Sequence, residues 1–162
     1  MSVFAGRLIV IGAITSLTAC VSVKTYQDNP EAQFTYRHSA SNFKVAWNRL
    51  QTGNDTAFEG LIKNVLKTDV RDIELNVMVL DTDGKVLSEG AVLLPRVNLK
   101  KNDSVPFSVK LKNAVMEKGN VLQFLLRYHI NNGSWYGRDG QSSFTVDAAT
   151  GAAIEEQREQ QN

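Results

Sequence analysis

Alternation of apolar and polar side chains is the dominant pattern of the chain and predicts β-strands. The clearest run covers residues 73–80. There Ile73, Leu75, Val77 and Val79 alternate with Glu74, Asn76, Met78 and Leu80. A period of two is typical of a strand with one buried face. Comparable runs predict six further strands, at residues 42–47, 58–64, 86–94, 105–111, 122–130 and 144–146.

Turn signals separate these runs. Asp83-Gly84 is typical of a tight hairpin, because both residues accept positive φ. Gly60 interrupts the second predicted strand and indicates a bulge. Seven short strands without a long amphipathic helix predict an all-β fold, an antiparallel immunoglobulin-like sandwich over residues 42–147. The Cys-Trp-Cys pattern of antibody domains is absent, so the sequence defines the fold class better than the strand topology.

The segments on either side of the predicted sandwich lack this alternation. Residues 20–41 contain scattered aromatics but no period of 2 or 3.6, which predicts a tether in front of the domain. Residues 148–162 are small or charged, which predicts a flexible or weakly helical tail.

The first twenty residues have the features of a bacterial export signal. A positively charged start ending at Arg7 precedes an apolar run at 8–19, which is too short to span a bilayer. The sequence Leu17-Thr18-Ala19-Cys20 resembles the lipobox of bacterial lipoproteins. The resemblance implies cleavage after residue 19 and acylation of Cys20, which would anchor the chain in a membrane. In bacterial lipoproteins an Asp directly after the acylated cysteine favours retention in the inner membrane. This chain has Val21 there, which implies sorting to the outer membrane, with the domain facing the periplasm.

Composition narrows the possible functions. The 162 residues include 18 basic and 17 acidic side chains, and removal of the signal segment with Arg7 leaves 17 of each. This balance argues against nucleic-acid binding, which needs clustered Lys and Arg. Cys20 is the single cysteine, so no disulfide can form within the chain. A buried free cysteine in a helix is the alternative reading of Cys20, and the lack of a polar face along residues 8–19 disfavours it.

Part of the chain resembles the FxLYD-type immunoglobulin-like domains of bacterial envelope proteins. Gly60, Ile62 and Asn64 match the first element of that pattern, a Gly-x-Val-x-Asn strand. The naming motif is degraded: Val77, Val79 and Leu80 replace Phe, Leu and Tyr, whereas Asp81 is kept. Gly84-Lys85 and Pro106-Phe107 match the remaining elements. The resemblance covers about a third of the chain and implies a binding or spacer module without catalytic residues.

The sequence contains no convincing site of chemistry. His38 and His129 are the only histidines, one in the predicted tether and one at an outward strand position, so a shared zinc site is not expected. Residues 81–84 lack the spacing of a calcium loop and are explained by the hairpin. No serine has the setting of a nucleophile elbow. We therefore expect no catalytic residue, no metal and no cofactor apart from the acyl lipid on Cys20.

Two groups of residues are candidates for binding a partner. Trp135, Tyr136 and Arg138 lie in a glycine-rich loop, and interfaces concentrate such side chains. The alternative is that Trp135 folds back over the end of the sandwich. Met78 and Leu80 on the third predicted strand form either an exposed apolar patch or the second face of a central strand.

These observations favour a non-enzymatic lipoprotein that binds another component of the cell envelope, most simply a protein. Two alternatives stay open. One is a structural spacer that pairs through its edge strands. The other is a lipid or glycan carrier, or an enzyme, whose site forms only in three dimensions.

Overall fold

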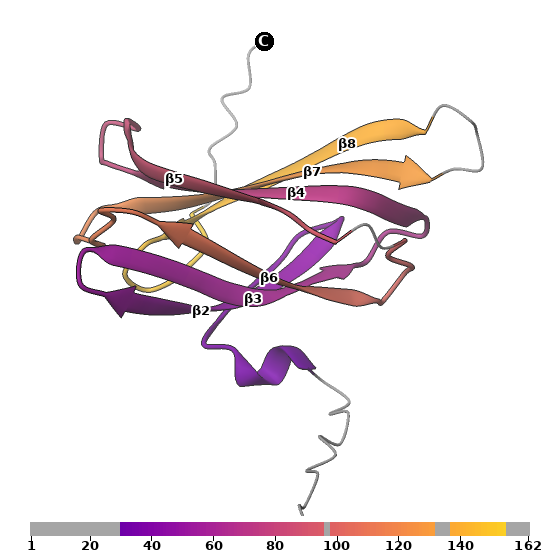
Figure 1. The fold of residues 1–162 in the computed structure, drawn as a ribbon, viewed down its shortest axis with the longest axis horizontal. Helices are drawn as coiled ribbons and strands as arrows, with labels where there is room; N and C mark the ends of the chain where they lie inside the picture. The colour runs from indigo at the N-terminus through magenta and orange to yellow at the C-terminus, as the bar shows by residue number, and fades with distance from the viewer. Residues whose placement is uncertain (1–29, 96–97, 132–136, 155–162) are drawn as a thin grey trace, which may run out of the picture.

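Two antiparallel sheets pack face to face and form the domain (Figure 1). The computed structural model describes residues 30–95, 98–131 and 137–154, which contain eight strands and one short 3-10 helix, η1 (Pro30–Gln33). Sheet A has the order β1-β2-β3-β6. Its strands are β1 (Tyr36–Ser39), β2 (Phe43–Thr52), β3 (Asp55–Asn64) and β6 (Ser104–Leu111). Sheet B has the order β5-β4-β7-β8. Its strands are β4 (Asp69–Leu80), β5 (Val86–Leu93), β7 (Val121–Asn131) and β8 (Arg138–Asp147).

The chain passes from one sheet to the other after β3, β5 and β6, whereas hairpins join β1 to β2, β2 to β3, β4 to β5 and β7 to β8. This arrangement is an immunoglobulin-like sandwich, so the predicted fold class is confirmed. All seven predicted strands are present, although several extend further than the alternation indicated. No helix among the described residues is long and apolar enough to cross a membrane.

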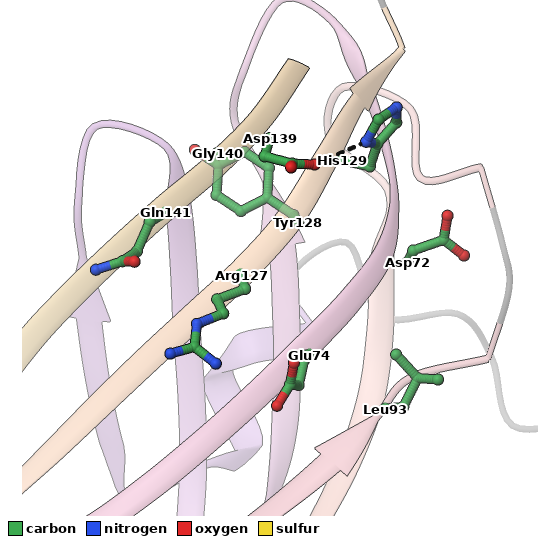
Figure 2. A pocket seen from close by; sticks show the side chains of 9 residues that line it. All are labelled: Asp72, Glu74, Leu93, Arg127, Tyr128, His129, Asp139, Gly140 and Gln141. Atoms are coloured by element: carbon green, nitrogen blue, oxygen red, sulfur yellow. Dashed lines mark hydrogen bonds and ion pairs between the residues drawn. The ribbon is translucent and has the colours of Figure 1, made fainter. Parts of the chain in front are cut away.

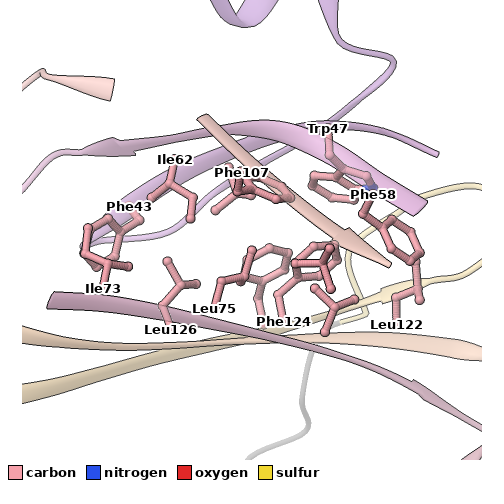
Figure 3. Close-up of a cluster of buried hydrophobic side chains, with 14 of the residues drawn as sticks. Phe43, Trp47, Phe58, Ile62, Ile73, Leu75, Phe107, Leu122, Phe124 and Leu126 are labelled. Carbon is pink, nitrogen blue, oxygen red and sulfur yellow. The ribbon is translucent and has the colours of Figure 1, made fainter. Parts of the chain in front are cut away.

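The core lies between the sheets and is built from the inward positions of the alternating strands (Figure 3). Trp47 of β2 packs against Phe124 of β7, with ring centroids 4.7 Å apart. Phe124 in turn stacks on Phe144 of β8, with centroids 4.8 Å apart and an interplanar angle of 6°. Aromatic contacts of this kind stabilise beyond their buried area by about 1 kcal/mol each. They connect β2 of sheet A to β7 and β8 of sheet B.

The predicted tether is wrong at its C-terminal end, because residues 36–39 form β1. Tyr36 stacks on Trp47 with ring centroids 5.7 Å apart. His38 stacks on Phe144 with centroids 4.0 Å apart. Two inward positions are too few to produce a recognisable period, and one of them is a histidine, which the pattern counts as polar. The part of the predicted tether before residue 30, including Cys20, lies outside the described residues.

The predicted tail also begins too early, because residues 148–154 fold back along the outer edge of β8. Ala148 is buried, Ala153 forms an isolated bridge with Val146, and the Ile154 amide donates to the Thr145 carbonyl at 3.0 Å. Backbone hydrogen bonds hold this segment in place. Such bonds leave no hydrophobic period in the sequence, so the alternation pattern could not predict it. Residues 155–162 lie outside the described residues.

Glycines at two positions serve different purposes. Gly84 has a φ of 78° and completes the predicted Asp83-Gly84 hairpin between β4 and β5. Gly60 forms no bulge, because the register passes through it unbroken on both sides. A Cβ at Gly60 would lie 2.1 Å from the Ala46 carbonyl oxygen, so close approach of the backbones explains this glycine.

Candidate functional site

The outer face of sheet B carries a row of side chains that crosses all four strands. Glu74 of β4 pairs in register with Leu93 of β5 on one side and with Arg127 of β7 on the other. Arg127 is in turn opposite Gln141 of β8. Because side chains at paired positions project from the same face, these four lie side by side above the sheet (Figure 2).

A groove of about 520 Å³ lies over this row and extends toward the β7–β8 loop. The residues that line it are Asp72, Glu74, Leu93, Arg127, Tyr128, His129, Asp139, Gly140 and Gln141. Most of them are polar and belong to strands that are far apart in the sequence. The groove is therefore a product of strand register and not of any single loop.

A β-bulge in β4 shapes one side of the groove. Arg71 is opposite His129 and Glu74 is opposite Arg127, so β4 has one more residue than β7 between these pairs. Asp72 lies in this extra stretch and has a φ of 51°, in the left-handed region that asparagine and aspartate tolerate best among residues with a side chain. The bulge brings the Asp72 carboxylate to the end of the groove, as Figure 2 shows.

His129 and Asp139 close the same end of the groove from β7 and β8. The imidazole Nδ1 and the carboxylate Oδ1 are 2.9 Å apart. The Asp139 side chain is 95% exposed, so this pair orients the imidazole ring but adds little to stability. A Cβ at Gly137 would lie 1.9 Å from Nε2 of His129, so only glycine leaves room for the ring.

Gly140 and Tyr128 form part of the floor. A Cβ at Gly140 would lie 2.4 Å from the Tyr128 ring, so the glycine is needed for the ring to pack there. The Tyr128 hydroxyl accepts a hydrogen bond from Nδ2 of Asn42 at 3.0 Å. Burial raises the pKa of Tyr128. The Tyr128 ring belongs to the core between the sheets, where it meets Phe43 edge-on with centroids 4.8 Å apart, so its phenol is not a polar group of the groove.

The groove is acidic overall. Among the described residues that line the groove, the carboxylates of Asp72, Glu74 and Asp139 outnumber the guanidinium of Arg127, which gives a net charge of −2 when His129 is neutral. Arg71, whose Nε lies 3.7 Å from Oδ2 of Asp72, reduces this to −1. Nδ2 of Asn76 donates to Glu74 at 3.1 Å. No described carboxylate lies within ion-pair distance of Arg127. The excess of carboxylates over guanidinium groups in the groove suits a ligand that carries basic and hydrogen-bonding groups.

The candidates chosen from the sequence stand in different relations to the groove. Trp135 and Tyr136 lie outside the described residues, between the end of β7 and the start of β8 in the sequence. Arg138 begins β8 and is exposed. It pairs with Ile130, at a position that alternates with those of Asp139 and Gln141, which line the groove.

Met78 and Leu80 lie on the outer face of β4, beyond the groove along the strand. Both are half-buried, opposite Gln123 and Val121 of β7. They correspond to the second face of a central strand, which is one of the two interpretations that the sequence allowed.

Sequence reasoning missed most of the groove because its residues meet only through the register of β4, β7 and β8. The outward position of His129 was predicted and is confirmed. His38 lies instead on β1, at a separate small pocket with Phe144 and Ile154. Among the described residues, no group of three or more His, Cys, Asp or Glu side chains could hold a metal ion.

Comparison with known proteins identifies neither a matching family model nor a matching curated sequence. Among solved structures, the GAE domain of GGA2p from Saccharomyces cerevisiae is 10% identical over 68% of this chain and 96% of that chain, with a TM-score of 0.39. OgpA from Akkermansia muciniphila is 18% identical over 75% of this chain and 31% of that chain, with a TM-score of 0.36. A β-glucuronidase from Bacteroides uniformis is 14% identical over 64% and 13%, with a TM-score of 0.36. The chain spans less than a third of these two bacterial proteins, and no site residue is transferred from them.

Proposed function

We propose that this protein is a lipid-anchored protein of the bacterial cell envelope that binds another envelope protein through the groove on sheet B. The observation that carries the proposal is the acidic groove itself, which four strands build on one face of the sandwich. The expected occupant is a protein segment with Lys or Arg side chains, because the groove has a net negative charge and exposed acceptors.

The anchor rests on the sequence. Leu17-Thr18-Ala19-Cys20 has the order of a lipobox and follows an apolar run of signal-peptide length. The outer membrane and the periplasmic orientation follow from Val21 and belong to the same proposal. The resemblance to FxLYD-type domains supports a binding or spacer module in the envelope.

Metabolic labelling tests the anchor. Cells that express the full chain are grown with an alkyne analogue of palmitate, and the membranes are separated. We expect label on the wild-type chain in the outer-membrane fraction and none on Cys20→Ser. A wild-type chain without label would refute acylation, whereas a labelled chain in the inner membrane would refute only the sorting.

Photo-crosslinking in intact cells tests the groove. A photoreactive residue at Gln141 places the probe at the groove, and the same residue at Glu59 places it on the exposed outer face of sheet A. We expect Gln141 to capture one predominant protein that Glu59 does not capture. The proposal fails if both positions give the same products, or if a folded and labelled chain gives none.

A further inference from the structure

β5 is the least protected edge of the two sheets. It pairs only with β4, and its other side has no strand partner among the described residues. It is eight residues long and contains neither proline nor lysine. Among the described residues, three of the six large exposed hydrophobic side chains lie on it, and Leu93, at 62% exposure, is the most exposed. Natural proteins usually protect such edges with prolines, lysines or a covering segment.

The other three edges have this protection. β6 contains Pro106 and carries Lys110, whose amino group pairs with Asp55 at 2.8 Å. The C-terminal half of β8 is covered by the bridge between Val146 and Ala153. β1 is only four residues long.

Over residues 88–93 the backbone of β5 presents regularly spaced donors and acceptors on its open side, and a bulge at Leu87 ends this regular stretch. The Leu94 amide donates to the Ile73 carbonyl at 2.8 Å, so Leu94 and every second residue before it point toward β4. By the alternation of a strand, the backbone groups of Glu89, Ala91 and Leu93 point away from the sheet. A second strand could therefore form a ladder there.

The sequence of β5 is complementary to itself in the antiparallel direction. We propose that β5 pairs with β5 of a second copy of this chain about a two-fold axis through Gly90, which joins two sheets B into one continuous sheet. In this register Glu89 lies opposite Ala91 of the second copy, and Leu93 lies opposite Leu87. No like charges face each other, and apolar residues meet at both ends. A register centred on Glu89 would instead place two carboxylates together.

The geometry of this dimer also suits two copies that are anchored in the same membrane. This part of the inference rests on the proposed lipid anchor. A two-fold axis between antiparallel strands of one sheet is perpendicular to that sheet, so both copies of sheet A lie on the same side. The first described residues, in η1, lie against the outer face of sheet A, where Glu31 pairs with Lys63 at 3.6 Å (Figure 1). Both copies of η1 thus lie on one side of the dimer.

Cysteine crosslinking of the full chain in its membrane tests the register. The double variant Glu89→Cys/Ala91→Cys brings two cysteines opposite each other at a Cα separation of about 5.5 Å, within reach of a disulfide. The control Glu89→Cys/Leu93→Cys leaves them diagonal, at roughly 7–8 Å. We expect a disulfide-linked dimer with the first variant only, and none with the wild type. A dimer from the control alone would refute this register, and none from either would refute the pairing.

The same samples keep the anchor and the pairing separate, because palmitate label is measured on each. A crosslinked chain without label would overturn the anchor and leave the pairing. A labelled chain without crosslinks would overturn the pairing alone.

A matched pair of charge variants tests the interface in solution. Ala91 is exposed in the single chain, so neither Ala91→Glu nor Ala91→Lys disturbs the core. In the dimer, residue 91 of each copy lies opposite Glu89 of the other copy. Ala91→Glu therefore creates two repulsive carboxylate pairs, and Ala91→Lys creates two ion pairs. For the detergent-solubilised full chain, we expect the dimer of Ala91→Glu to have a dissociation constant roughly tenfold higher than that of the Ala91→Lys dimer. Equal dissociation of the two variants, or a monomeric wild type at every concentration, would refute the proposal.

Discussion

Asn64 offers the most direct test of how the sandwich is held together. Its side chain is fully buried at the end of β3 and forms three hydrogen bonds. Nδ2 donates to the carbonyls of Thr68 and Leu99, each at 2.9 Å, and Oδ1 accepts from the Leu66 amide at 2.9 Å. The side chain thereby fixes the connection from β3 to β4 and ties it to the segment before β6.

The cost of removing these bonds can be estimated from their number. Each contributes about 1 kcal/mol net, and a buried group left without a partner costs about 1–3 kcal/mol. Leu99 keeps the hydrogen bond that its carbonyl accepts from Val70, which limits the loss. We therefore expect Asn64→Ala to lower the free energy of unfolding by about 3 kcal/mol. That is a large part of the total for a domain of this size, which is about 5–15 kcal/mol.

Equilibrium unfolding in urea measures this change. The buried Trp47 provides a fluorescence signal, and the midpoint together with the slope gives the free energy. Asn76→Ala is the matched control, because Asn76 is half-buried on the outer face and, among the described residues, its side chain bonds only to Glu74. If the two variants differ by less than about 0.5 kcal/mol, the structural role assigned to Asn64 is wrong.

Three further predictions concern glycine packing and pH. Gly60→Ala should lower the free energy of unfolding by about 3 kcal/mol, because its Cβ would collide with the backbone of the neighbouring strand; a melting temperature within error of the wild type would contradict this. Gly140→Ala should cost about 2 kcal/mol by displacing the Tyr128 ring, which near-ultraviolet circular dichroism detects as a changed aromatic signal. Burial lowers the pKa of His38 from 6.5, so its stabilising contribution is complete above pH 6.5 and is lost as the pH falls from there through the lower pKa of the folded state. His38→Phe, which keeps a ring stacked on Phe144, should lose less melting temperature than the wild type between about pH 7.5 and pH 5.5; equal losses would refute the assignment.

The sequence determined the fold class because burial on one face of a strand leaves a period of two. The run at 73–80 and the hairpin at Asp83-Gly84 are both found where they were predicted. The pattern failed where structure depends on few residues or on the backbone alone. β1 has only two inward positions, and the segment at 148–154 is held by main-chain hydrogen bonds.

The groove was harder to predict than the fold for a physical reason. Outward positions are polar on most half-exposed strands, so Glu74 and Arg127 carry no distinguishing pattern. Their proximity follows from the pairing of β4 with β7, and from a bulge at Asp72 that shifts this pairing by one residue. A one-residue shift moves every side chain of a strand to the other face, so such a site cannot be assembled from a sequence without its register.

The measurement that tests the central claim most directly is the affinity of the full chain for the protein captured at Gln141, compared between two charge reversals. Glu74→Lys changes the charge inside the groove, and Glu59→Lys makes the same change on the exposed outer face of sheet A. If the groove binds a basic segment, Glu74→Lys should weaken binding by at least about tenfold, and added salt should weaken binding to the wild type. Glu59→Lys should stay within about twofold of the wild type. Equal effects of the two reversals would contradict binding at the groove.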